Sequence, residues 1–173
     1  MAVTPSPGLP PLLRDRGAWL LASAYLLFFA FLCPLAAFFP DLHDEGGKYV
    51  FLPTALFDGN MDFVHQRQGY NLAYKATPTG HSHHQWGVGP SLLWSPFFLA
   101  GHGLARLSTA LGHPFALDGW SFPYLLAVET GSLLYGWAGL LLLYDLLRRL
   151  HGRSAGFLAS FALFFSSAVP YPQ

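Results

Sequence analysis

The chain has 173 residues, of which 53% are hydrophobic and only 10% are charged. A soluble domain has about 25% charged residues, so this composition argues against an ordinary soluble protein. The nine basic residues balance the nine acidic ones, which gives no long-range attraction to nucleic acid. Aromatic residues make up 17% of the chain, as in helices that anchor at membrane surfaces. We therefore expect an all-α integral membrane protein without a nucleic-acid partner.

The N-terminal segment and the first apolar run set the expected orientation. Residues 1–17 begin rich in Pro and Gly without a repeating period and are predicted to form a disordered cytoplasmic tail. Residues 18–39 contain no charge, and as a helix they would be about 33 Å long, enough to span a bilayer. Because Arg14 and Arg16 precede this span, the N-terminus is predicted to be cytoplasmic and Asp41 to lie outside.

A short surface helix is predicted over residues 44–57, just beyond the first span. Asp44 and Lys48 are one turn apart, which suits an ion pair on an exposed face. Tyr49 begins the apolar side of this helix and is expected to have a structural or groove-lining role. Pro53 is expected to kink or end it.

A second surface helix is predicted over residues 91–107, although this segment is nearly apolar enough to span. Its polar residues fall within an arc of roughly 60° at 100° per residue; they are Ser91, Ser95, His102 and Arg106. Such a stripe suits a helix that lies in the interface or lines a groove. If the segment spanned, six of the nine basic residues would lie outside, against the positive-inside tendency. We therefore read the helix as juxtamembrane or re-entrant, within one extracytoplasmic loop at 40–121.

Two further spans are predicted, at 122–147 and 154–169, joined by a tight Arg-rich cytoplasmic turn. The expected architecture is thus three transmembrane helices plus one or two juxtamembrane helices in a long outer loop. Residues 18–173 are expected to form part of a single membrane domain.

Glu129 lies inside the predicted second span, about 10 Å deep. Intramembrane carboxylates are costly and usually face a cavity or a partner. Arg106 on the outer helix could pair with it and brace the floor of a site. A protonated Glu129 at a helix interface is the alternative.

The order of these elements and their motifs resembles a known family. Asp44-Glu45 opens the loop, and three further motifs follow it: Phe57-Asp58-Gly59-Asn60-Met61-Asp62-Phe63, Thr77-Pro78-Thr79-Gly80, and the segment from Gly87 to Phe98. The layout resembles the N-terminal module of GT-C-fold glycosyltransferases, in particular protein O-mannosyltransferases and the bacterial enzymes that add aminoarabinose to lipid A. More narrowly, it resembles uncharacterised bacterial multispan proteins grouped with them. The resemblance covers residues 18–169.

The resemblance implies an inverting enzyme of the bacterial inner membrane that takes a sugar from a polyprenyl phosphate. The acceptor would be a hydroxyl group on the extracytoplasmic side, and the resemblance does not specify the molecule that carries it. Such enzymes are longer and have more spans, so the chain would be an N-terminal fragment, inactive alone. Displacement by a hydroxyl needs a base, for which Asp44 is the candidate, with Glu45 orienting it. The alternative is a solvated acidic helix start, favourable with the helix dipole.

Positive or hydrogen-bonding groups are needed to hold the leaving phosphate. The candidates are Lys75, His83, His84 and Arg106. Each of them could instead be an exposed loop charge or an anchor to anionic headgroups. The histidine-rich segment could bind a divalent metal with Asp44 or Glu45. Relatives with an Asp-Glu opening mostly act without one, so we predict no metal and no cofactor.

Two other functions fit parts of the sequence. The chain could be a non-enzymatic, small multispan membrane protein whose outer loop binds a ligand or partner. It could also be a proton-coupled transporter built around Glu129, but such transporters contain inverted repeats, and this sequence shows none.

Overall fold

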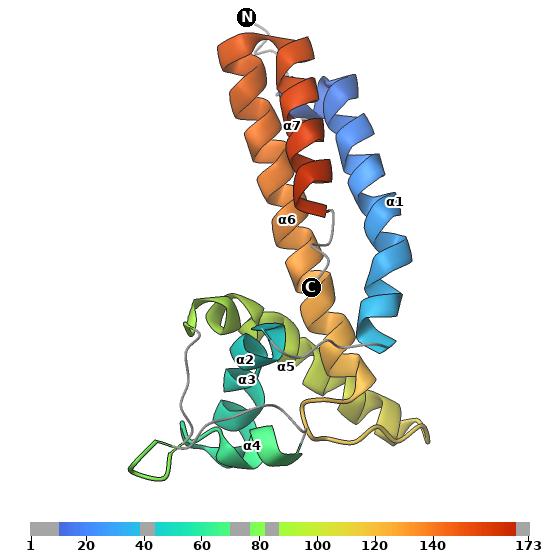
Figure 1. Cartoon of the computed structure of the whole chain (residues 1–173). Helices are drawn as coiled ribbons and strands as arrows, with labels where there is room; N and C mark the ends of the chain where they lie inside the picture. The colour runs from blue at the N-terminus through green and yellow to red at the C-terminus, as the bar shows by residue number, and fades with distance from the viewer. Residues whose placement is uncertain (1–10, 39–43, 70–76, 82–86, 169–173) are drawn as a thin grey trace, which may run out of the picture. The chain divides into compact units, whose positions relative to one another are not determined.

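The structure is a computed structural model that describes residues 11–38, 44–69, 77–81 and 87–168 (Figure 1). All regular structure in these residues is helical, and they contain no strand. The elements are η1 (Pro11–Arg14), α1 (Arg16–Phe38), α2 (Asp44–Tyr49), α3 (Phe51–Pro53), η2 (Thr54–Asp58), α4 (Val64–Gly69), α5 (Gly89–Ala110), α6 (Phe122–His151) and α7 (Arg153–Ala168). The expectation of a helical protein is therefore confirmed for the described part of the chain.

The chain forms two compact units. Unit 1 consists of Met1–Ala30 and Leu133–Gln173, and unit 2 consists of Phe31–Ser132. Helix α6 contributes its first eleven residues to unit 2 and the remainder to unit 1.

One helix in the described part of the chain, α6, is long and apolar enough to cross a membrane. The described apolar stretches of the other two predicted spans are shorter, at Arg16–Ala30 in α1 and Arg153–Phe164 in α7. A membrane helix is thus supported at the second predicted span. The spans at 18–39 and 154–169 stay predictions.

In unit 1, α6 and α7 form a helical hairpin with α1 beside it (Figure 1). Gly152 ends α6 in the left-handed conformation, with a φ of 85°, and its N–H donates to the Arg148 carbonyl at 3.1 Å. This is the usual glycine-ended helix terminus, because a Cβ would be strained at that φ. The core of the unit contains Ala18, Leu21, Tyr25, Leu140, Tyr144 and Phe164.

A buried aspartate ties the start of α1 to the α6–α7 hairpin. Asp15 is only 4% exposed, and its Oδ1 accepts the Gly17 N–H at 2.9 Å, capping α1. The same oxygen accepts the Tyr144 hydroxyl at 3.0 Å. Its Oδ2 lies 3.0 Å from Nε of Arg153 and 3.5 Å from a terminal nitrogen of Arg148. Residues 1–10 of the predicted tail lie outside the described residues, whereas Asp15 within the predicted tail is held by four groups.

Arg148 continues this polar cluster along α6. It pairs with Asp145 through Nε at 2.8 Å and through a terminal nitrogen, and Arg149 pairs with the other Asp145 oxygen at 2.8 Å. Arg148 therefore lies between two carboxylates, Asp15 and Asp145, and contacts both.

The large apolar side chains of unit 1 that are exposed lie along all three of its helices. They are Trp19, Leu20, Leu26 and Leu27 in α1, Leu134, Tyr135, Leu142, Leu146 and Leu150 in α6, and Leu158, Phe161 and Leu163 in α7. Polar side chains such as Asp15 and Ser160 are buried in the same unit. Unit 1 therefore buries a few polar side chains beside its apolar core and leaves many leucines exposed.

In unit 2, the segment predicted as one surface helix at 44–57 is three helical pieces, α2, α3 and the π-helical turn η2. The helical path is nearly continuous, because Val50 has helical dihedral angles and accepts the Thr54 N–H at 3.2 Å. The sequence predicts that Pro53 kinks or ends the helix, but Pro53 has helical dihedral angles and the path continues through it as the π-helical turn η2. The buried core around it consists of Tyr49, Val50, Leu52, Phe63, Phe98, Ala105, Trp120, Tyr124 and Val128.

Helix α5 is closely packed against the first turn of α6. A Cβ added at Gly101 would lie 2.8 Å from the Pro123 carbonyl oxygen and 2.9 Å from Cα of Tyr124. Both are backbone atoms that cannot rotate away, so glycine is needed at this crossing. Gly103, two residues later, faces open space.

Replacement of Gly101 tests this crossing. Gly101→Ala must push α5 away from α6 and is expected to lower stability by about 1–3 kcal/mol. Gly103→Ala is the matched control and should be neutral or stabilising by about 0.5–1 kcal/mol, because alanine favours the helix. Thermal unfolding of both variants in detergent measures the difference. Equal effects of the two substitutions would contradict the packing.

The charge on Asp15 gives a second prediction. Burial raises the pKa of its carboxyl, but the Gly17 N–H, the Tyr144 hydroxyl and the guanidiniums of Arg153 and Arg148 together hold that pKa below 3.8. The folded state therefore gains stability from this carboxylate above pH 3.8 and loses it as the pH falls through the lowered pKa. Asp15→Asn keeps the helix cap but removes the charge.

We expect Asp15→Asn to melt at a lower temperature than the unaltered protein at neutral pH, measured in detergent. The gap should shrink as the pH falls below 3.8, where the aspartate itself becomes protonated. A gap of constant size across this range would mean that the ion pairs do not contribute.

Candidate functional site

All of the candidate site residues named from the sequence belong to unit 2. Lys75, His83 and His84 lie outside the described residues. Asp44 and Glu45 are the first two residues of α2, and their side chains also lie outside what the structure describes. The backbone that carries these two acids is nevertheless placed by its contacts.

Helix α2 is fixed at its C-terminal half. Tyr49 is 5% exposed, and its hydroxyl donates to the Gly119 carbonyl. The Lys48 carbonyl accepts the Ser91 hydroxyl from the start of α5. Gly46 and Gly47 are buried, so the backbone of α2 packs closely against its neighbours. Asp44 and Glu45 therefore begin a helix whose other end is anchored in the core of unit 2.

The predicted polar stripe of α5 divides in two. Ser91 and His102 reach other elements, because the His102 Nδ1 lies 2.6 Å from the Tyr124 hydroxyl on α6. Arg106, one turn further along, is exposed. The opposite face of α5 is apolar and exposed, and carries Leu92, Leu93, Leu99, Leu104 and Leu107.

Glu129 is half-buried in α6 and belongs to unit 2, as does Arg106. The predicted pair between these two residues stays a prediction. The part of α6 around Glu129 packs tightly, since a Cβ added at Gly131 would collide with the Phe97 ring of α5.

A second polar cluster lies where η2, α4 and the 111–121 loop meet. The Gln66 amide donates to both Asp58 oxygens, at 3.1 and 3.0 Å, and its carbonyl accepts the Trp120 indole N–H at 2.9 Å. Gln66 is 4% exposed. His65, on the exposed side, adds an Nδ1 contact to Asp58 at 3.1 Å. This cluster joins two neighbouring segments, η2 and α4, to a loop that lies 54 residues further along the sequence.

Nearby loop residues add weaker contacts. Asp62 lies 3.4 Å from Nδ1 of His81, and both side chains are exposed. Among the residues that the structure describes, no group of three or more His, Cys, Asp or Glu is arranged to hold a metal ion. The expectation that no metal is needed stays a prediction, because His83 and His84 are outside that set.

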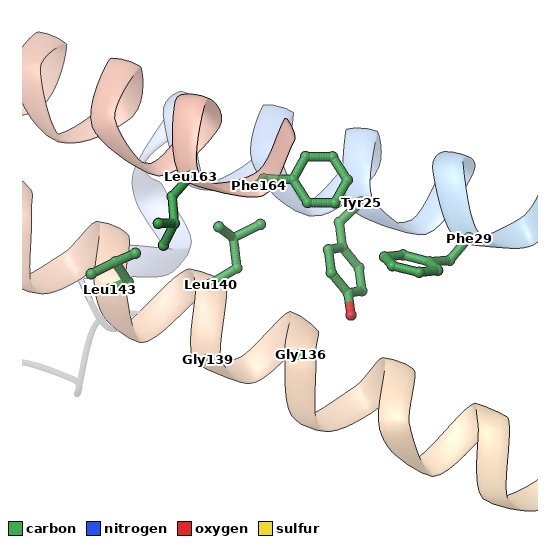
Figure 2. A pocket seen from close by; sticks show the side chains of 8 residues that line it. All are labelled: Tyr25, Phe29, Gly136, Gly139, Leu140, Leu143, Leu163 and Phe164. Carbon is green, nitrogen blue, oxygen red and sulfur yellow. The ribbon is translucent and has the colours of Figure 1, made fainter. Parts of the chain in front are cut away.

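Each unit has an apolar cavity. In unit 2, a groove of about 470 Å³ lies between α5 and the start of α6; its residues include Phe97, Leu104, Phe115, Phe122 and Leu126. In unit 1, a pocket of about 310 Å³ lies between α1, α6 and α7 (Figure 2). Gly136 and Gly139 leave one wall of this pocket without side chains, opposite Tyr25, Phe29 and Phe164.

Sequence reasoning missed the cluster around Gln66 and the buried role of Asp15. The residue types of Asp58-Gly59-Asn60 predict a turn. The structure has a turn there, with Gly59 at a φ of 64°. No local pattern indicates that Asp58 pairs with Gln66 and, through it, with Trp120. Asp15 had a usable signal, since an aspartate directly before a long apolar helix is a typical N-cap.

Comparison of the chain with protein families, with curated proteins and with solved structures finds no match. The described fold and cavities define a helical protein with one helix suited to crossing a membrane. Anything more specific is a proposal.

The Gln66 cluster yields a testable prediction. Gln66→Ala removes both hydrogen bonds from the Gln66 amide to Asp58 and the hydrogen bond from the buried Trp120 N–H, at a total cost of about 1–3 kcal/mol. His65→Ala is the control, because it removes only an exposed contact to the same carboxylate and should have little effect. Thermal unfolding and Trp fluorescence of both variants report the result. If His65→Ala were the more damaging change, the cluster would not support the loop as described.

Proposed function

We propose that this chain is the N-terminal, donor-facing part of a bacterial inner-membrane glycosyltransferase of the GT-C type. It would take a sugar from a polyprenyl phosphate and help transfer it, with inversion, to an acceptor hydroxyl outside the cell membrane. The observation that carries the proposal is an anchored helix, α2, that begins with two acids and packs on a helix, α5, whose free face is leucine-rich.

Membrane embedding is supported by the distribution of side chains. Only 17% of the most apolar window of α6 is buried, so its apolar surface is not covered by the described chain. Burying a leucine is worth about 1.5–3 kcal/mol, and the exposed leucines of α1, α6 and α7 would together cost a large part of the stability in water. A lipid surrounding removes that cost and favours polar groups paired inside.

The proposed topology has three spans, at 18–39, 122–147 and 154–169, with the N-terminus in the cytoplasm. The arginines at the start of α1 and at the α6–α7 turn would then lie on the cytoplasmic side, as the positive-inside tendency favours. The loop at 40–121 would lie outside, with α5 at the membrane surface and its leucines in the acyl region.

The proposed chemistry uses Asp44 as general base for the acceptor hydroxyl and Glu45 as its orienting neighbour. A hydroxyl is a weak nucleophile until a base takes its proton. A fixed α2 is the kind of support such a base needs, because a displacement of the order of 1 Å is costly to catalysis. Lys75, His83, His84 and Arg106 would hold the leaving phosphate.

A lipid-linked donor also needs a place for its chain. The apolar groove between α5 and α6 has a suitable lining and lies in the same unit as Asp44 and Arg106. We assign the isoprenoid part of the donor to this groove as part of the proposal.

Asp44→Asn in the full-length protein tests the mechanism. We expect transfer from a radiolabelled polyprenyl-phosphate sugar to fall by about 10²–10⁴-fold, the usual contribution of a general base, while the amount of protein inserted in membranes stays the same.

Asp62→Asn is the matched control for that experiment. It removes an acid from the same loop but keeps the oxygen that accepts the Val64 N–H, so activity should be retained. Full activity of the Asp44→Asn variant would remove Asp44 from the role of base.

A further inference from the structure

A wide pocket at one end of unit 1 combines arginines with apolar side chains. It is lined by Arg14, Asp15, Arg16, Gly17, Leu20, Tyr144, Arg153, Ser154, Phe157 and Leu158. The N-terminal ends of α1 and α7 and the C-terminal end of α6 meet there (Figure 1). None of these residues takes part in the proposed sugar transfer.

Polar and apolar residues are separated along the helices that form this pocket. Arg16 begins α1, and Leu20 follows one turn later. In the same way, Arg153 and Ser154 begin α7, and Phe157 and Leu158 follow one turn later. The basic ends of both helices therefore lie at one level and their apolar residues at the next, which suits a ligand with an anionic head and apolar chains.

The charge balance at this end of the unit is positive. This end contains two described aspartates, Asp15 and Asp145, and five arginines: Arg14, Arg16, Arg148, Arg149 and Arg153. Arg148 and Arg149 pair with Asp145, whereas Arg14 and Arg16 are exposed and make no ion pair with a described carboxylate. Arg153 turns Nε toward Asp15, yet 74% of its side chain is exposed.

Asp15 holds the helix ends and the Arg153 side chain in place around the pocket without occupying the pocket itself. It caps α1, and it fixes the Arg153 side chain at the start of α7. The positive ends of the α1 and α7 dipoles add to the potential at the same place.

We propose that this pocket binds an anionic phospholipid, with the phosphodiester at Arg14, Arg16, Arg153 and Ser154 and an acyl chain along Leu20, Phe157 and Leu158. The chemistry follows that of basic pockets between membrane helices, which bind anionic lipid headgroups. The site lies in unit 1, apart from the residues assigned to sugar transfer, and it depends on membrane embedding but not on the glycosyltransferase activity.

The test is a lipid titration of the purified, delipidated protein in a non-ionic detergent, followed by native mass spectrometry. Phosphatidylglycerol and phosphatidylcholine with the same acyl chains are compared. We expect phosphatidylglycerol to bind several-fold more tightly. Arg14→Gln and Arg16→Gln should each weaken phosphatidylglycerol binding by about fivefold and leave phosphatidylcholine binding unchanged. Both side chains are exposed, so neither change should disturb the fold.

Arg149→Gln is the matched control, because it removes one exposed charge from the same end of the unit but does not line the pocket. It should leave both affinities unchanged. Excess inorganic phosphate should not displace the lipid, since it makes no apolar contacts. Equal binding of the two lipids, unaltered binding by the Arg14 and Arg16 variants, or full displacement by inorganic phosphate would each overturn the proposal.

Discussion

Polar groups that are removed from water must be paired within the protein, and this constraint explains the placement of both polar clusters. In unit 1, the Asp15 carboxylate is shared by a backbone N–H, a tyrosine hydroxyl and two guanidiniums. In unit 2, Gln66 satisfies Asp58 and Trp120 together. Asp15 and Gln66 are each only 4% exposed, so each cluster is centred on a buried polar side chain that the surrounding groups must satisfy.

Close backbone contact is the second constraint. Gly101 lets α5 lie against the start of α6, and Gly156 lets α7 approach α6, where an added Cβ would be 2.7 Å from the Arg148 nitrogen. Small residues at such contacts let the backbones of two helices approach closely. The anchored position of α2 follows from the same packing, because α2 is bonded to α5 at Ser91.

Much of the helical layout could be predicted from the sequence, and much of the site could not. The long uncharged run is a local signal, and α1 follows it. The helix predicted at 91–107 corresponds to α5. The sequence does not show, however, that Ser91 and His102 bond to other elements of unit 2 while the leucines of α5 are exposed. That choice depends on partners 43 and 22 residues away.

By itself, the sequence determined a helical, apolar chain with an acidic start to the loop after the first run, because composition and period are local properties. Only the tertiary structure decided that Asp15 is buried among arginines, that Gln66 joins Asp58 to Trp120, and that Gly101 is a contact point while Gly103 is not. These facts depend on which faces meet when the helices pack. Helical periodicity places Gly101 and Gly103 on opposite faces of α5, but it does not say which of these faces meets α6.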